Sequence, residues 1–143
     1  MKNLLYILVL ATSVFVSGNL SGQDYVKGAT YNIARDMTIS GSNFPGQCES
    51  CILNISEGIT LTINKDISIP NAVINGGKIV LNKTMTFWSD GHFNNVMVTV
   101  NNAGSIVSSG SLSMDNSIFT FSGKAVGTFW SKVDVSNTVI RFL

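Results

Sequence analysis

Residues 114–143, MDNSIFTFSGKAVGTFWSKVDVSNTVIRFL, contain one complete unit of a repeat and the beginning of the next. Asn116 precedes the alternating segment SIFTF, and Asn137, one unit later, precedes TVIRF. The pattern continues toward the N-terminus through Asn95, Asn71 and Ser50, and the separations are equal apart from a wider one between Asn71 and Asn95. A period of about 21 residues is typical of a solenoid, in which each unit buries its apolar side against its neighbours.

Each unit divides into three short segments that are rich in β-branched and aromatic residues, with glycines at the turns between them. In the first complete unit the segments are residues 52–55, 59–63 and 67–69. The unit between Asn71 and Asn95 carries three extra residues. We therefore expect an all-β protein, a short single-stranded parallel β-helix with three-strand coils of about 21 residues. The repeats are expected over residues 51–143, after an N-terminal cap and lead-in at residues 23–50.

The repeat, punctuated by asparagine, resembles the right-handed parallel β-helix of the pectin lyase-like superfamily, in which stacked asparagines occupy a tight turn on successive coils. The resemblance covers residues 50–143 and rests on repeat form, without a catalytic motif. It implies a structural ladder in which each side-chain amide bonds to the next, and asparagine also tolerates the left-handed backbone that such a turn needs. The members of this expected ladder are Asn71, Asn95, Asn116 and Asn137.

The first residues are typical of a secretory signal peptide, which we place at residues 1–22. Lys2 precedes an apolar run at residues 4–16, and small polar residues follow. The run is too short to span a bilayer comfortably. We therefore expect an exported protein, extracellular, on the cell surface or in the periplasm, without membrane insertion of the mature chain.

Charge is balanced, with nine Lys and Arg against eight Asp and Glu and a formal net charge of +1. Neither sign clusters along the chain. Nucleic acid is thus excluded as the main partner, because its recognition needs a basic patch that neutralises phosphate. The lyases of the superfamily that this chain resembles hold calcium with clustered acidic residues. They use an Arg or Lys as base, and these residues are set in long loops. Here the acidic residues are scattered and the loops are short, so we expect no metal and no cofactor.

Cys48 and Cys51 are the only cysteines, and in an exported protein we expect them to form a disulfide that pins the entry to the first coil. A redox pair of the thioredoxin kind would open a helix, whereas Cys51 opens a strand. Zinc would need two further ligands, and His92 is the one obvious candidate.

Asp90 and His92 are candidates for a ligand or for acid–base chemistry, because residues two apart face the same side of an extended segment. The alternative is a solvated strand position. Counting from each asparagine places His92 level with outward polar residues, namely Ser68, Ser113 and Asp134. We expect no catalytic residue in the chain.

Trp88 and Trp130 lie in identical TFWS segments that are separated by two repeat periods, which corresponds to two coils. They align with Asn64 and Ser109 at a turn, and two coils place them about 10 Å apart along one edge. Two exposed indoles at this separation could stack on sugar rings or anchor a protein partner. The alternative is that each indole folds over its own corner as packing.

Two adjacent apolar columns follow the asparagine turns, and strict alternation cannot bury both. The first column is Ile52, Val73, Met97, Ile118 and Val139. The second column is Leu53, Ile74, Val98, Phe119 and Ile140. We expect the bend at each turn to direct both inward; the alternative is an apolar outer stripe that suits a partner. Phe87 and Phe129, which align with Ile63, are also expected to point inward.

The sequence therefore predicts an exported, non-enzymatic β-helix module that acts as a surface or envelope scaffold. The expected partner is another protein, or a second copy bound through the C-terminal coil, since no helix follows residues 138–142 to cover that coil. The alternative is a carbohydrate-binding or polysaccharide-lyase-like β-helix that uses Trp88 and Trp130, with polysaccharide as its ligand.

Overall fold

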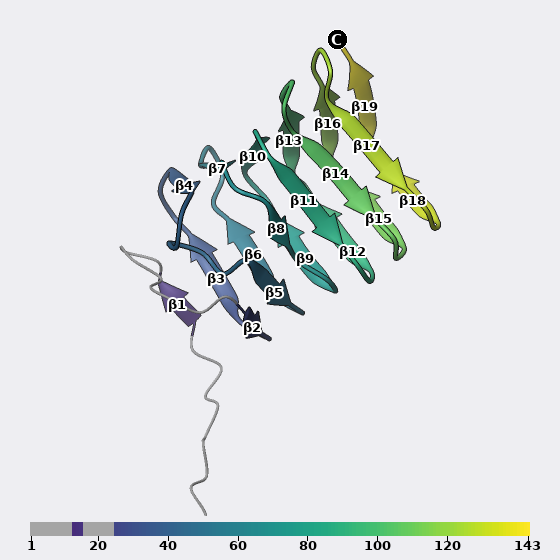
Figure 1. Ribbon diagram of the computed structural model, residues 1–143. Coiled ribbons are helices and arrows are strands. Elements are labelled where there is room, and N and C mark those ends of the chain that lie inside the picture. The colour runs from purple at the N-terminus through teal and green to yellow at the C-terminus, as the bar shows by residue number, and fades with distance from the viewer. Residues whose placement is uncertain (1–12, 16–24) are drawn as a thin grey trace, which may run out of the picture.

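The computed structural model describes residues 13–15 and 25–143, which form a parallel β-solenoid of about six turns (Figure 1). This part of the chain consists of strands and turns and contains no helix. The predicted fold class is confirmed: three sheets run along the stack, and the coils have the predicted length. Most of the predicted signal peptide, residues 1–22, lies outside the described residues.

Three parallel sheets make up the three sides of the solenoid. Sheet A contains β1 (Ser13–Phe15), β3 (Thr30–Ile33), β6 (Ile52–Ile55), β9 (Ala72–Asn75), β12 (Gly91–Asn94), β15 (Leu112–Asp115) and β18 (Val133–Ser136). Sheet C contains β4 (Met37–Ile39), β7 (Thr60–Ile63), β10 (Lys78–Leu81), β13 (Met97–Val100), β16 (Ile118–Phe121) and β19 (Val139–Phe142). Sheet B contains β2 (Tyr25–Lys27), β5 (Gln47–Glu49), β8 (Ile67–Ser68), β11 (Thr84–Phe87), β14 (Ser105–Ser108) and β17 (Val126–Phe129).

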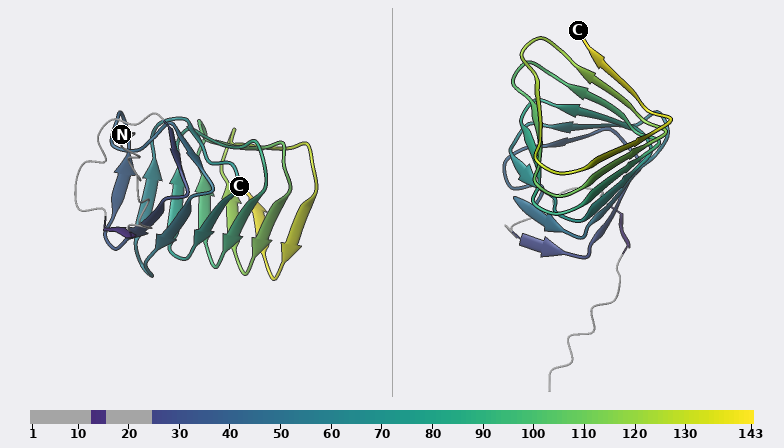
Figure 2. Two further views of the ribbon diagram at one scale, coloured as in Figure 1. Left: turned by 90° about the horizontal axis from the view of Figure 1, so that it is seen from below. Right: turned by 90° about the vertical axis from the view of Figure 1, so that its right-hand side faces the viewer.

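Each coil passes through sheet A, then sheet C, then sheet B, and the next coil begins again in sheet A. Figure 2 shows the coils stacked in chain order. The segment expected to act as a cap and lead-in contributes strands β2 to β5 to all three sheets, so from Tyr25 onward it has the same architecture as the later coils.

The coils differ in length, and one shortened coil changes the register that the sequence suggested. In sheet A, Ile52 pairs with Val73 after a coil of the regular length, but Val73 pairs with His92 after a coil that is two residues shorter. The pairs in the following coils return to the regular length. The unit expected to carry three extra residues is therefore a shortened coil, and the wide separation between Asn71 and Asn95 spans a coil plus one further strand.

As a result, the four asparagines of the expected ladder lie at two different corners. Asn71 lies between sheets B and A, whereas Asn95, Asn116 and Asn137 lie between sheets A and C. All four have positive φ, from 46° to 55°, which fits their turn role. Gly76 takes the equivalent position one coil before Asn95, with φ 71°. The prediction that these four asparagines form one ladder was wrong, because the same backbone turn occurs at both corners.

A different set of asparagines forms the side-chain ladder, on the outer face of sheet A. The amide of Asn54 donates to Asn32 Oδ1 at 2.9 Å, Asn75 donates to Asn54 at 2.9 Å, and Asn94 donates to Asn75 at 3.0 Å. A second, shorter ladder joins Asn64, Asn82 and Asn101 at the corner between sheets C and B. These amides are partly buried or at the surface, and each bond links one coil to the next.

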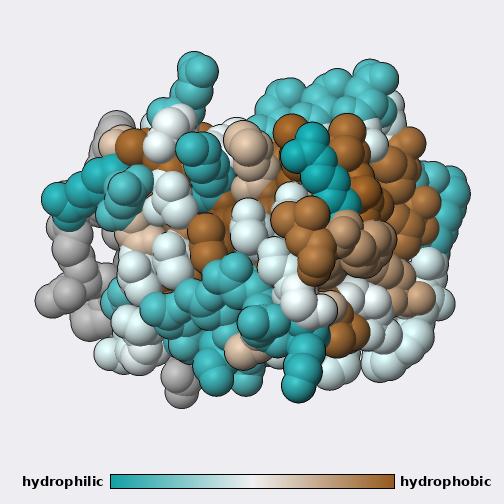
Figure 3. All heavy atoms as spheres, turned by 90° about the horizontal axis from the view of Figure 1, so that it is seen from above, coloured by the Kyte–Doolittle hydropathy of each residue, from teal (hydrophilic) through white to brown (hydrophobic). Residues whose placement is uncertain are grey.

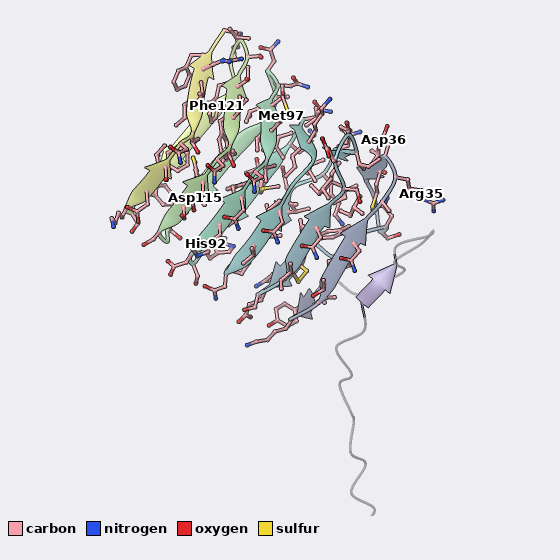
Figure 4. The ribbon with its side chains drawn as sticks, turned by 180° about the vertical axis from the view of Figure 1, so that it is seen from behind. Arg35, Asp36, His92, Met97, Asp115 and Phe121 are labelled. Carbon is pink, nitrogen blue, oxygen red and sulfur yellow. A yellow bond between two sulfur atoms is a disulfide. The ribbon has the colours of Figure 1, made fainter. Side chains whose placement is uncertain are left out.

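The sheet A ladder is followed by Asp115, which pairs with Asn94 in the register and accepts a hydrogen bond from the Ser113 hydroxyl at 2.9 Å (Figure 4). Every ladder amide donates toward the preceding coil, and an ionised carboxylate has no proton to donate. We expect Asp115→Asn to extend the ladder and raise the free energy of unfolding by about 0.5 to 1.5 kcal/mol. Urea denaturation measures this change. Ser113→Ala is the control for the hydroxyl contact, and a destabilised Asp115→Asn variant would contradict the prediction.

Side chains alternate strictly between the interior and the surface. The second apolar column is buried from Leu53 to Phe119, whereas the first column points outward, with Ile52 and Met97 exposed. The prediction that the turn would direct both columns inward was wrong, because the strands stay regular up to each corner. The outward residues do not form one stripe either, since Ile52 lies on sheet A and Met97 lies on sheet C.

The core is narrow and is closed by residues from all three sides. Phe87 of sheet B, Phe93 of sheet A and Phe119 of sheet C are fully buried and contact one another edge to face, with Phe93 in the middle. Phe87 aligns with Ser108 and Phe129 and not with Ile63, which lies in sheet C. Cys48 and Cys51, both fully buried, form the predicted disulfide at the corner between sheets B and A.

At the corners, acidic and amide side chains bind the backbone of the following coil. Asp66 accepts a hydrogen bond from the Thr84 N–H at 2.9 Å, and Asp36 accepts one from the Thr60 N–H at 2.8 Å. Asn102 does the same for Lys124 at 2.9 Å. We call these contacts corner bonds; they satisfy backbone donors where the strand ladders are interrupted.

Candidate functional site

The most distinctive surface feature is an edge that carries both tryptophans. Trp88 follows β11 and Trp130 follows β17, and each leaves its strand at the corner between sheets B and A. Their preceding phenylalanines point inward, so alternation turns the indoles outward. Trp88 is 64 % exposed and Trp130 is 72 % exposed. Neither indole is packed over its corner, in contrast to the packing alternative.

Ser109 lies between the two tryptophans, one coil from each. Its N–H donates to the Phe87 carbonyl at 2.9 Å, and the Trp130 N–H donates to the Ser108 carbonyl at 2.9 Å. These backbone bonds hold Trp88, Ser109 and Trp130 in one column with the regular strand spacing, so the backbones of the two tryptophans are about 10 Å apart. We call this column the tryptophan edge.

The same column continues toward earlier coils through Pro70 to Glu49 and Lys27. The Lys27 ammonium lies 3.0 Å from one carboxylate oxygen of Glu49, and the Tyr25 hydroxyl donates to the other at 2.5 Å. Hydrogen bonds from Tyr25 and Lys27 hold the pKa of Glu49 below its ordinary value. No pattern in the sequence joins these three residues to the tryptophans, because the shortened coil lies between them.

Asp90 and His92, the other ligand candidates, are not joined to each other by a hydrogen bond within the described residues. Asp90 makes a corner bond, accepting the Ser111 N–H at 3.0 Å. His92 is exposed on the outer face of sheet A (Figure 4), level with Ser113 and Asp134 as predicted, but next to Val73 and not Ser68. The corner bond means that Asp90 joins two coils. Asp90 and His92 therefore do not form an acid–base pair in the structure.

A shallow hollow of about 550 Å³ lies at the corner between sheets A and C. Gly76 and Gly77 form part of its floor, and Glu57 and Lys78 contribute charges of opposite sign. The glycines are needed for packing, since a Cβ on Gly77 would lie 2.2 Å from the Ile55 side chain. The turn at residues 56–59, which contributes Glu57 and Gly58 to the lining, is longer than the two-glycine turn of the next coil.

Apolar side chains gather over the later coils, as Figure 3 shows for one face. They include Met97 and Val139, which lie in one outward column of sheet C with the partly buried Ile118 between them. In the last coil, side chains at inward positions are also exposed, notably Ile140 and Phe142. The surface of the solenoid is thus more apolar toward its last coil.

The described residues contain no group of three or more His, Cys, Asp or Glu side chains placed to hold a metal ion. In the same part of the chain, no helix has the length and apolar character needed to cross a membrane. Comparison of the chain with protein-family models, with curated proteins and with solved structures found no match in any of the three.

Proposed function

We propose that this chain is an exported, non-enzymatic β-helix module that serves as a surface or envelope scaffold and associates through its last coil. The observation that carries this proposal is the exposure of side chains at inward positions there. Ile140 is 41 % exposed and Phe142 is 78 % exposed, although Phe119 and Phe121, their partners one coil earlier, are buried. Export is proposed from the signal-like residues 1–22.

A second copy of the chain suits this edge geometrically. Strands β17, β18 and β19 each pair on one side only in this chain, and each contains four residues. A two-fold axis through the middle of β19, perpendicular to the stack, would pair β19 antiparallel with its copy. The same axis exchanges sheets A and B, so β18 of one copy would meet β17 of the other. Such pairing satisfies edge hydrogen bonds and buries the exposed apolar side chains.

The mass of the purified chain in solution tests this proposal. We expect a dimer by sedimentation equilibrium at micromolar concentration, and a monomer when Ile140 and Phe142 are both replaced by aspartate, because a buried unpaired charge opposes the interface. Met97→Asp is the matched control, since it places the same charge on an exposed apolar position of sheet C, and it should remain dimeric. A strictly monomeric wild type that captures no partner would overturn the proposal.

Carbohydrate binding is the second candidate, and the exposed tryptophans at matching positions support it. Indoles present broad apolar faces that pack on the C–H face of a sugar ring, and exposed tryptophan is uncommon without a partner. The repeat-form resemblance to the pectin lyase-like superfamily is compatible with a polysaccharide ligand. The structural use of Asp90 favours binding over cleavage.

Retention on insoluble polysaccharide tests the second candidate. The wild-type chain should be retained on β-1,4-linked glucan or mannan, and the Trp88→Ala/Trp130→Ala variant should not. Met97→Ala, which removes an exposed apolar side chain elsewhere, should be retained like the wild type. Unchanged retention of the double tryptophan variant would eliminate this candidate.

A further inference from the structure

We propose that the tryptophan edge binds an extended chain of neutral, β-linked hexopyranose units, which lies parallel to the solenoid axis and continues from Trp130 to Glu49 and Lys27. This inference rests on the carbohydrate-binding candidate and adds to it the class of polysaccharide, its direction and the far end of its path.

The direction follows from the column geometry. Trp88 and Trp130 occupy the same position in coils that are two apart, so the line that joins the indoles runs along the stack. The regular spacing of parallel strands makes this separation about 10 Å. In an extended chain with equatorial linkages, alternate rings are separated by a similar distance. Alternate sugar rings can therefore stack on the two indoles, with their C–H groups against the electron-rich ring faces.

Ser109 suits the sugar ring between them. Its hydroxyl donates to the Trp88 carbonyl at 3.0 Å, which orients the oxygen and leaves lone pairs free to accept a hydrogen bond from a sugar hydroxyl. The side chain is small and exposed, so it leaves room for the middle ring.

Glu49 and Lys27 provide polar contacts at the other end of the path. Glu49 lies two coils before Trp88, with the buried Pro70 between them. The Tyr25 hydroxyl and the Lys27 ammonium fix its carboxylate, which can accept hydrogen bonds from sugar hydroxyls while its charge stays paired.

The charges along the edge favour a neutral ligand over a uronate. Lys27 is paired with Glu49, and at the opposite end Lys132 lies 2.8 Å from Asp134. Both described lysines beside the edge are thus neutralised by a carboxylate. Asp90, two residues after Trp88 at the same corner, adds negative charge that would repel an anionic chain.

The length of the path sets the size of the ligand. From Lys27 to Trp130 the column makes five steps between coils, which amounts to about 24 Å. A chain of about five sugar units covers this distance. Binding should therefore strengthen as the oligosaccharide lengthens to about that size and then change little.

The test is a titration of the full chain with cello-oligosaccharides and manno-oligosaccharides of increasing length, followed by tryptophan fluorescence and calorimetry. We expect both indoles to respond, and Trp88→Ala and Trp130→Ala each to weaken binding of the longest oligosaccharide about tenfold. Glu49→Gln should leave the affinity for short oligosaccharides unchanged and remove the gain between three and five units. Met97→Ala serves as the control that should match the wild type.

The outcomes separate this inference from the candidate on which it rests. Tryptophan-dependent binding without any length dependence, or with a Glu49→Gln variant that behaves as wild type throughout, overturns the axial path and leaves carbohydrate binding standing. Preference for polygalacturonate overturns the neutral ligand. Absence of binding to any of these sugars, including the insoluble polysaccharides, overturns both, as does tryptophan-dependent capture of a protein in place of a sugar.

Discussion

Replacing Phe93 by alanine is expected to lower the free energy of unfolding by about 3 to 5 kcal/mol. The Phe93 ring is fully buried and lies 5.6 Å from the ring of Phe87 and 5.1 Å from that of Phe119, measured between centroids. These three rings come from the three different sheets, so the loss of the middle one leaves a cavity where the sides of the solenoid meet. Rigid strands on every side limit how far this cavity can collapse.

Denaturation in urea, followed by circular dichroism, measures this effect. Met97→Ala is the control, because it removes apolar atoms from a side chain that is 48 % exposed and lies outside the proposed dimer interface. We expect the control to cost less than about 1 kcal/mol, in line with substitutions at exposed sites. Equal losses for the two variants would show that the interior between the sheets is not packed as described.

Replacing Asn75 by alanine is expected to lower the free energy of unfolding by about 1 to 3 kcal/mol. Asn75 lies in the middle of the sheet A ladder, where its amide donates to Asn54 and its oxygen accepts from Asn94. Removal of this amide leaves the Asn54 oxygen and the Asn94 amide group without their ladder partner. An unpaired, partly buried polar group costs more free energy than the net contribution of one hydrogen bond.

Asn71→Gly provides the control for this second prediction. Glycine tolerates the positive φ of this corner, so the substitution removes an exposed amide without straining the turn. We expect a change of only a few tenths of a kcal/mol. A larger loss at Asn71 than at Asn75 would favour the ladder that the sequence suggested over the one in the structure.

The presence of three short strands in each coil could be predicted because it depends on the local sequence alone. Alternating β-branched residues, interrupted by small polar residues and glycine, specify three short strands per coil whatever the register. The disulfide could be predicted as well, since two cysteines three residues apart at the start of a coil are close in space by necessity. These features require no knowledge of which strand lies next to which.

The predicted register was wrong between Asn71 and Asn95 because two different corners contain an asparagine with a left-handed backbone. Asparagine is favoured wherever a non-glycine residue takes a left-handed backbone, so its recurrence marks a corner without saying which corner it is. The sequence gives no sign of this change of corner, because Gly76 and not an asparagine takes the left-handed position in the coil before Asn95. The true ladder did leave a signal, an asparagine near the end of four successive sheet A strands, but its spacing shortens at the same coil.

The candidate site was predictable only in part, for the same reason. No irregular coil separates Trp88 from Trp130, so their separation of two repeat periods correctly placed them on one edge. The exposure of the two indoles could not be predicted from the sequence, since the side chain of a turn residue can fold over its corner or project from it. Glu49 and Lys27 lie beyond the shortened coil, and no local pattern connects them with the tryptophans.

The corner bonds have a consequence for mechanical load. Hydrogen bonds of a parallel sheet point along the stack, so tension applied between the first and last coils pulls along the bonds that join one coil to the next. The corners are the places in each junction where the strand ladders stop. Asp36, Asp66, Asp90 and Asn102 each carry a bond at such a place. These four side chains therefore raise the force that a tethered solenoid withstands before its coils separate.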